Sequence, residues 1–247
     1  MSLSREELVY MAKVSEQTER FEDMLNYMKQ VVQQGNDLSV EERNLLSVAY
    51  KNSVGSRRTA WRALEAIEQK EESKGGRHTN LIKEFKKKVK EELDSFCNDV
   101  LNLIDNSVLK NCSSPESRVF FLKMKGDYYR YLAECSTGEQ QSKISQGGLS
   151  AYQEATSIAT NELKETNPIR LGLALNFSVF YYEILNNPTQ ACSLAKQAFD
   201  DAIAKIEELN DDEYKDSTTI MQLIRDNLTL WSSELDGQDE EEGNADQ

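Results

Sequence analysis

Apolar residues recur at spacings of three and four along most of the chain, a pattern that predicts amphipathic α-helices. No segment shows the strict alternation of apolar and polar residues that is typical of a half-buried strand. One apolar stripe is complete enough to define a helix by itself, and it ends at Gly35. Its members are Phe21, Met24, Leu25, Met28, Val31 and Val32. The pattern therefore predicts an all-α fold of nine antiparallel helices.

Capping residues and prolines mark where several of these helices begin. Ser4 with Glu7, and Ser39 with Glu42, have the spacing of a capping box. Each of the three prolines follows a serine or an asparagine, so each is expected at the first helical position, where its missing N–H costs nothing. These prolines are Pro115, Pro168 and Pro188.

The remaining boundaries come from breaks in the apolar pattern. The third helix is expected to run to Gly75-Gly76, the fourth from about 79 to 109, the sixth from about 141 to 163 and the ninth from 211 or 212 to about 235. We expect residues 1–235 to form a single helical domain. Residues 236–247 carry several acidic and no basic residues, which indicates a disordered acidic tail.

Composition narrows the class of protein. No apolar run approaches the roughly 20 residues that cross a bilayer, and the N-terminus lacks the order of a secretory signal, so we expect a protein of the cytoplasm or nucleus that is not inserted in a membrane. The 4 cysteines are widely spaced without a C-x-x-C pair, which favours free thiols over a disulfide framework or a zinc site. No metal and no cofactor are expected. The formal net charge of -14 argues against nucleic acid as a partner.

Two predicted helices carry pairs of basic residues two turns apart. Lys51 and Arg58 project from one face of the third helix, and Lys123 and Arg130 from one face of the fifth, with Tyr131 next in the chain. Guanidinium, ammonium and phenol groups suit a tetrahedral phosphate dianion. Taken one helix at a time, however, these residues also fit an ordinary solvated face, and spacing alone does not bring the two helices together.

Two later helices each combine apolar residues with an amide on one face. An extended peptide suits such a surface, because the amide bonds its backbone and the apolar groups cover its side chains. Ordinary core packing explains the same apolar residues equally well. The two faces consist of Leu175, Asn176, Val179 and Glu183, and of Leu223, Asn227, Leu230 and Trp231.

Catalytic chemistry has little support in the sequence. The 1 histidine, His78, lies in a predicted turn without a nucleophile motif near it, and no phosphate-binding glycine loop or metal-ligand spacing is present. We therefore expect that the protein is not an enzyme. The spacing of Gly126-Asp127-Tyr128-Tyr129 and Ala151-Tyr152 is similar to that of helix-hairpin repeats, which leaves a tetratricopeptide-like scaffold for unmodified peptides as the alternative function.

Two long segments resemble signatures of the 14-3-3 family. They are RNLLSVAYKN at residues 43–52 and NPIRLGLALNFSVFYYEI at residues 167–184. GDYYRYLAE at residues 126–134 and YKDSTTIMQLIRDNLTLW at residues 214–231 extend the similarity, which covers about residues 3–235 in order. The resemblance implies a cup-shaped protomer with an amphipathic groove, and an adaptor in signal transduction that binds phosphoserine or phosphothreonine motifs of client proteins.

The resemblance also assigns roles to residues. It implies that Lys51, Arg58, Arg130 and Tyr131 hold the phosphate and that Asn176 and Asn227 hold the ligand backbone. The apolar wall would consist of Leu175, Val179, Leu223, Leu230 and Trp231, with Lys123 and Glu183 as polar neighbours.

A two-fold dimer is implied as well, either a homodimer or a heterodimer with a related isoform. Residues 1–34 would supply the dimerisation helices, with Arg20 and Asp23 paired to Glu92 and Lys88 of the other subunit. Phe85 departs from the tyrosine that is common in the family at this interface. Ala60 stands where many members carry a serine whose phosphorylation loosens the dimer, so we expect this protein to lack that switch.

Overall fold

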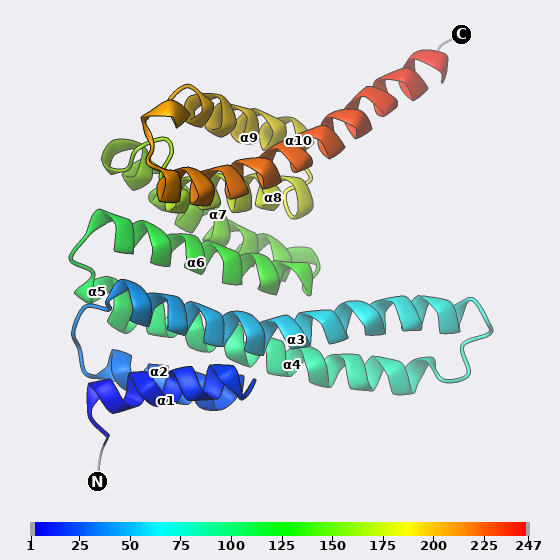
Figure 1. The fold of residues 1–247 in the computed structure, drawn as a ribbon. Helices are drawn as coiled ribbons and strands as arrows, with labels where there is room; N and C mark the ends of the chain where they lie inside the picture. The colour runs from blue at the N-terminus through cyan, green and yellow to red at the C-terminus, as the bar shows by residue number, and fades with distance from the viewer. Residues whose placement is uncertain (1–2, 246–247) are drawn as a thin grey trace. The chain divides into compact units, whose positions relative to one another are not determined.

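In the computed structural model, the backbone is described for residues 3–245 and the side chains for residues 3–234. Helices and no strand occur in these residues, which confirms the all-α prediction (Figure 1). Nine helices result when α4, the π-helical segment after it and α5 are counted as one. The bounds are α1 Arg5–Gln17, α2 Phe21–Gln33, α3 Val40–Glu72, α4 Thr79–Leu103, the π segment Ile104–Val108, α5 Leu109–Asn111, α6 Pro115–Glu134, α7 Gly138–Glu162, α8 Pro168–Glu183, α9 Pro188–Ile203 and α10 Asp211–Ala245.

The chain forms two compact units. Unit 1 contains residues 1–113 and 131–142, and unit 2 contains residues 114–130 and 143–247. The chain passes between the units three times, once in the loop between α5 and α6 and then inside α6 and inside α7. The single domain expected for residues 1–235 therefore remains a prediction, and each unit is described by itself below.

Unit 1 is built on the long hairpin of α3 and α4, against which α1 and α2 pack (Figure 1). Both predicted capping boxes are present: the amides of Glu7 and Glu42 donate to the hydroxyls of Ser4 and Ser39, both at 3.2 Å. Apolar side chains from these helices close a core in which the largest residues are less than 2% exposed. They include Met24, Met28, Leu46, Tyr50, Leu93 and Ile104.

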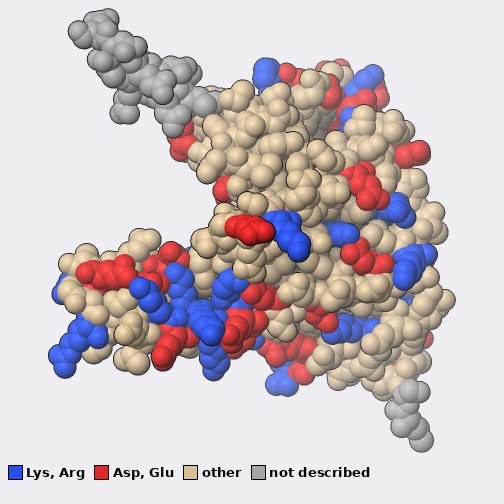
Figure 2. Space-filling model, turned by 180° about the vertical axis from the view of Figure 1, so that it is seen from behind, with Lys and Arg blue, Asp and Glu red and all other residues tan. Residues whose placement is uncertain are grey.

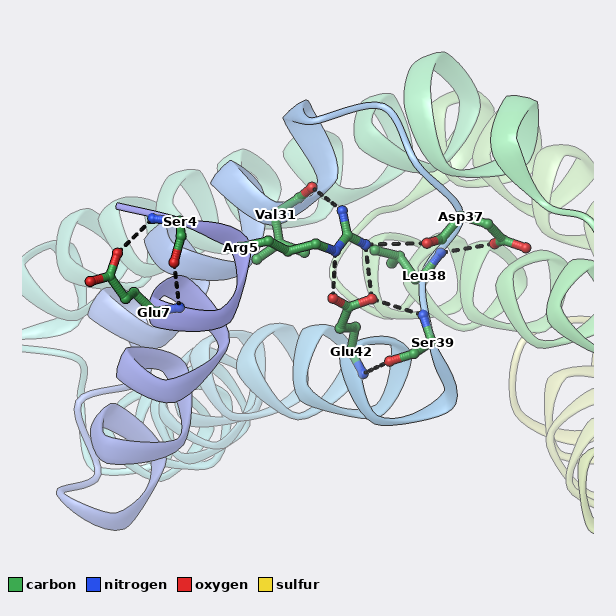
Figure 3. A network of polar contacts seen from close by, with 8 residues as sticks. All are labelled: Ser4, Arg5, Glu7, Val31, Asp37, Leu38, Ser39 and Glu42. Atoms are coloured by element: carbon green, nitrogen blue, oxygen red, sulfur yellow. Dashed lines mark hydrogen bonds and ion pairs between the residues drawn. The ribbon is translucent and has the colours of Figure 1, made fainter. Parts of the chain in front are cut away.

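A polar network fastens the start of α1 to the start of α3 (Figure 3). The Arg5 guanidinium donates to both carboxylate oxygens of Glu42, at 2.7 and 2.8 Å, and to the carbonyl of Asp37 at 3.2 Å. The Asp37 carboxylate accepts from the amide of Leu38 at 2.9 Å, and also from the amide and hydroxyl of Ser113. Three segments distant in sequence are thus tied together at one end of unit 1.

This network should make stability depend on pH in the acid range. Burial raises the pKa of Glu42, but the hydrogen bonds and charge of Arg5 outweigh it and lower the pKa. Burial likewise raises the pKa of Asp37, and the hydrogen bonds from Ser113 and Leu38 reverse it. A carboxyl group whose pKa is lowered by folding stabilises the protein above its unfolded pKa, and that stabilisation is lost as the pH falls through its folded pKa. The free energy of unfolding should therefore fall below about pH 4.5.

Urea denaturation at pH 7, 5, 4 and 3 would measure this dependence. Glu42→Gln should lower the free energy of unfolding at pH 7 and should flatten its decline in acid. Glu6→Gln, at an exposed position in the first turn of α1 beside Arg5, serves as the control. Parallel pH profiles for the wild type and Glu42→Gln would show that Glu42 does not contribute to the acid sensitivity.

Unit 2 contains a bundle in which α8, α9 and α10 pack on one another. The predicted start signals are confirmed: the side chains of Asn167 and Asn187 accept from amides of the first turns of α8 and α9, and proline follows each. One apolar cluster joins the three helices. Its buried members are Leu171, Ala191, Ala195, Ala202, Met221, Ile224 and Trp231.

Two helix boundaries differ from those expected, and one helix is interrupted. Helix α7 begins at Gly138, three residues before the expected start, because Gly138 takes a positive φ of 61° that starts the turn. A π-helical segment interrupts the fourth predicted helix without ending it. Helix α10 continues to Ala245, past the expected end near Leu235, and residues 240–242 are glutamates, which have a high intrinsic helix propensity. Within the described residues, no helix is both long and apolar enough to cross a membrane.

Candidate functional site

The first group of predicted phosphate-binding residues lies in unit 1. Lys51 and Arg58 of α3 and Tyr131 of α6 line one open depression of about 760 Å³. Lys51 is exposed and makes no ion pair with any residue that the structure describes. Figure 2 shows several basic side chains lying together on the surface of α3 and α4, with acidic side chains beside them. An anion would be held locally, by these few groups.

A partly buried ion pair fixes the position of Arg58. Its Nε and Nη2 atoms both contact the Oε2 atom of Glu134, at 3.0 and 2.9 Å, and both side chains are less than a fifth exposed. The guanidinium stacks over the ring of Tyr131, with its Cζ atom 3.9 Å from the ring centroid. Arg62 contacts the other oxygen of Glu134. Arg58 is therefore oriented before any ligand arrives.

The second group lies in unit 2 around a buried carboxylate. Asp127 is 6% exposed, and its Oδ2 atom accepts from Lys123 Nζ at 2.9 Å. Its Oδ1 atom accepts from the Tyr152 hydroxyl at 2.6 Å and from Asn176 Nδ2 at 2.9 Å. Arg130 Nη2 lies 3.8 Å from the same Oδ1 atom. One carboxylate thus connects three of the residues that the sequence analysis singled out.

Glycine at position 126 allows Tyr152 to reach this carboxylate. A Cβ atom at Gly126 would lie 2.7 Å from the Tyr152 ring, closer than side chains tolerate. The ring also stacks on Phe177, with centroids 5.1 Å apart. The close approach of α6 and α7 therefore depends on the absence of a side chain.

Electrostatics keep Asp127 charged despite its burial. Burial raises the pKa of this carboxyl, but the charges of Lys123 and Arg130 and the hydrogen bonds from Tyr152 and Lys123 outweigh it, so the pKa is lowered. Burial and the Asp127 charge together raise the pKa of Tyr152 well above its usual value, so the phenol keeps its proton. Asp127 therefore serves as a shared counter-charge for two cations, Lys123 and Arg130.

The polar residues predicted on α8 join the same group. Asn176 contacts Asp127, as described above, and the Glu183 carboxylate lies 3.6 Å from Arg130 Nη1. The structure therefore brings together Lys123, Arg130, Asn176 and Glu183 within unit 2. Whether they form one site with Lys51, Arg58 and Tyr131 of unit 1 remains a prediction, for which the adjacency of Arg130 and Tyr131 in the chain is the sequence argument.

The predicted apolar wall has both exposed and covered members. Leu223 and Leu230 on α10 are 49% and 55% exposed, as a peptide-binding surface requires. Leu175 and Val179 are half-buried against the core cluster of unit 2, and Asn227 is half-buried on α10.

Trp231 differs from the expectation, because it is only 4% exposed and offers little surface to a ligand. Its ring stacks on Tyr182 at a centroid distance of 4.8 Å, and the Tyr182 hydroxyl donates to Glu234. A large ring gains more by burial against a second aromatic ring than by facing water. Trp231 thus supports α10 on α8 from within the core.

The residues predicted at a dimer interface make contacts inside the chain. Arg20 pairs with Asp23 three residues on, and Glu92 lies 3.2 Å from the Nε atom of Arg57. Lys88 is exposed, and Phe85 is 56% exposed, a large fraction for an aromatic side chain. These contacts do not test the predicted pairs between subunits.

Other reactive groups show no catalytic arrangement. The backbone amide of His78 donates to Glu71, and the histidine precedes α4 at an exposed position. Burial raises the pKa of the Cys135 thiol to about 12, and Cys97 is also buried with a raised pKa. Among the described residues no cluster of histidine, cysteine and carboxylate side chains is arranged to hold a metal ion.

Sequence reasoning missed three residues that the structure places in these groups. Glu134 and Arg62 could have been identified from the sequence, because each lies four residues from a predicted site residue on the same helix and so shares its face. No sequence pattern indicated a contact between Tyr152 and Asp127, because Tyr152 reaches the carboxylate from another helix, 25 positions along the chain.

Comparison with known proteins gives one consistent result. The model of the 14-3-3 protein family matches residues 11–232. The chain is 58% identical to 14-3-3 protein zeta of Bombyx mori, over 98% of this chain and 97% of that protein. It is 56% identical to 14-3-3-like protein F of Nicotiana tabacum, over 98% and 95%. It is 57% identical to the checkpoint signal transducer rad24 of Schizosaccharomyces pombe, over 94% and 87%.

Proposed function

Because the chain belongs to the 14-3-3 family, we propose that it is a dimeric adaptor that binds phosphoserine and phosphothreonine motifs of client proteins. Membership of the family confirms the prediction of a regulatory adaptor that is not an enzyme. The family assignment does not by itself establish three parts of this proposal, which rest on the arguments below. They are the dependence on phosphate, the dimer and the roles of individual residues.

The observation that carries the phosphate-binding role is that each of the two arginines lies against a carboxylate with little exposure to solvent. Glu134 holds Arg58, and Asp127 lies beside Arg130. Lys51 adds an exposed cation without an ion-pair partner in the described part of the chain. Guanidinium groups that are already oriented lose little conformational entropy when they bind a phosphate bidentately. Most of the interaction energy with the dianion therefore contributes to the binding affinity.

The peptide itself would lie along α8 and α10 of unit 2. Asn176 and Asn227 supply amides for its backbone, and the exposed Leu223 and Leu230 supply apolar surface for its side chains. A surface that combines hydrogen-bonding amides with apolar residues suits an extended segment better than a folded domain.

The dimer would use the exposed apolar residues of unit 1. Tyr10 on α1 is 66% exposed, and Leu81 and Phe85 on α4 are 65% and 56% exposed. Large apolar groups at such exposure are typical of surfaces that another chain covers. Sedimentation equilibrium should give twice the 28.2 kDa mass of the chain, and Phe85→Lys should shift the mass toward that of a monomer.

Localisation in the cytoplasm or nucleus is part of the same proposal, and imaging of a fluorescent fusion tests it.

Fluorescence anisotropy of a labelled, arginine-rich serine peptide tests the phosphate dependence. The phosphorylated peptide should bind at least about 100-fold more tightly than the same peptide without phosphate. Binding should also weaken as the pH falls through about 6, because the phosphate loses its second charge there.

Equal binding of the two peptides would overturn the proposal. It would favour instead a tetratricopeptide-like scaffold that recognises unmodified peptides. Binding of neither peptide at micromolar concentrations would also count against the proposed pocket.

A further inference from the structure

Unit 2 contains a hollow of about 380 Å³ between α7, α8 and α9. Its apolar part is formed by Ala159 of α7, Leu171, Leu173 and Ala174 of α8, and Leu194 and Ala198 of α9. The volume lies within the range of small-molecule sites, which are concave, largely apolar and equipped with a few polar groups. None of the residues predicted to bind the phosphopeptide lines this hollow.

The hollow is bordered by charged groups of both signs. Arg170 is half-buried, and its Nη1 atom donates to the carbonyl of Leu163 at 2.7 Å. Glu165 is also half-buried. Neither side chain has an ion-pair partner among the described residues, although both border the same hollow. Asp201 of α9 lines the same hollow, and its Oδ1 atom accepts from Gln197 Nε2 at 2.8 Å.

Such charges are costly when they are partly removed from water without a counter-charge. A ligand that supplies the missing charges recovers this cost, while its apolar body covers the half-buried Ala174, Leu194 and Ala198. An anion would meet Arg170 but also two carboxylates, and a cation would leave Arg170 without a partner. A neutral apolar molecule would leave all three charges unmatched. The charges therefore favour a ligand that carries one charge of each sign.

We propose that this hollow binds a small zwitterion with an apolar body, a free apolar amino acid or dipeptide. Its carboxylate pairs with Arg170, whose planar guanidinium suits a bidentate carboxylate. Its ammonium group lies between Glu165 and Asp201. The volume is equivalent to about a dozen water molecules, which matches the size of an apolar dipeptide or a large amino acid.

This site uses a different face of α8 from the proposed phosphopeptide site. Arg170 and Ala174 border the hollow, whereas Asn176 and Val179 belong to the predicted peptide-binding face. The zwitterion site therefore does not require the proposed function to be correct. A variant that loses dipeptide binding but keeps phosphopeptide binding, or a variant with the opposite behaviour, would show that the two proposals are independent.

The first test is isothermal titration calorimetry of the full chain with L-leucyl-L-leucine. We expect saturable binding, and we expect N-acetyl-leucyl-leucine and leucyl-leucine amide each to bind at least tenfold more weakly, because each lacks one of the two charges. Absence of saturable binding would overturn the proposal. Equal binding of the dipeptide and either blocked form would overturn the assignment of a zwitterion.

Two variants locate the binding. Ala198→Leu should fill the hollow and weaken dipeptide binding at least tenfold, and Arg170→Gln should do the same by removing the carboxylate partner. Arg225→Gln, an equal loss of charge at an exposed position on α10, should change the affinity less than twofold. Circular dichroism checks folding, and the blocked peptides provide the test on the wild type if Arg170→Gln is unstable. Unchanged affinity in a folded Ala198→Leu protein would place any binding elsewhere.

Discussion

Replacement of Arg58 by glutamate is expected to weaken phosphopeptide binding by at least about 100-fold, equivalent to about 3 kcal/mol. The change removes a guanidinium that Glu134 and Tyr131 hold in position. It also places a second carboxylate next to Glu134, and like charges so close repel an incoming phosphate as well as each other. Fluorescence anisotropy with the phosphorylated serine peptide measures the loss.

Arg77→Glu provides the matched control. Arg77 lies exposed in the turn between α3 and α4, so the substitution changes the net charge equally without touching the depression. Its effect on affinity should stay within about twofold to threefold, because exposed and distant charges are screened by salt. A similar loss in both variants would mean that net charge, and not the held guanidinium, controls binding.

Replacement of Asp127 by asparagine is expected to lower the free energy of unfolding by about 3 kcal/mol. The substitution keeps the size of the side chain but leaves the cations Lys123 and Arg130 without their shared counter-charge in a buried place. The hydroxyl of Tyr152 also loses a charged acceptor. Chemical denaturation measured by circular dichroism gives the difference.

Asp200→Asn separates the effect of burial from that of the ion pair. Lys196 and Asp200 have the same four-residue spacing as Lys123 and Asp127, and their Nζ–Oδ2 distance is 2.7 Å, but both side chains are more than half exposed. Loss of this exposed pair should cost less than about 1 kcal/mol. Equal destabilisation in the two variants would contradict the central role of the buried carboxylate.

The pH dependence of the Asp127 variant has a defined sign. The folded pKa of Asp127 is lowered, so its charge stabilises the protein above the unfolded pKa of about 3.9, and this contribution is lost as the pH falls through the folded pKa. The difference in unfolding free energy between the wild type and Asp127→Asn should therefore be largest near neutral pH and should shrink in acid.

Local signals in the sequence determined the elements of this protein. The capping boxes at Ser4 and Ser39 and the starts at Asn167 and Asn187 were predictable, because caps satisfy backbone groups within a few residues. Boundaries without such a signal were less accurate, as at the start of α7 and the end of α10. The apolar periodicity was sufficient to predict the all-α class, because this periodicity depends only on which face of each helix is buried.

The candidate site was predictable to the extent that its residues share a helix. Lys51 with Arg58, and Lys123 with Arg130, were found because two turns of one helix bring them to one face. Asn176 and Glu183 were found on one face of a later helix, and the structure places both near Arg130 or its partner Asp127. The family resemblance placed Trp231 on the apolar wall, whereas the structure covers the ring with Tyr182.

Only the tertiary structure decided which residues orient the basic groups. Glu134 meets Arg58 across 76 positions of the chain, and Tyr152 and Asn176 meet Asp127 across 25 and 49. Such pairings depend on how helices pack, and no local pattern of charge or hydrophobicity encodes them. The sequence by itself therefore determined the helices and the kinds of side chain on their faces. Packing determined which charges are buried together, and burial strengthens their interaction by excluding water.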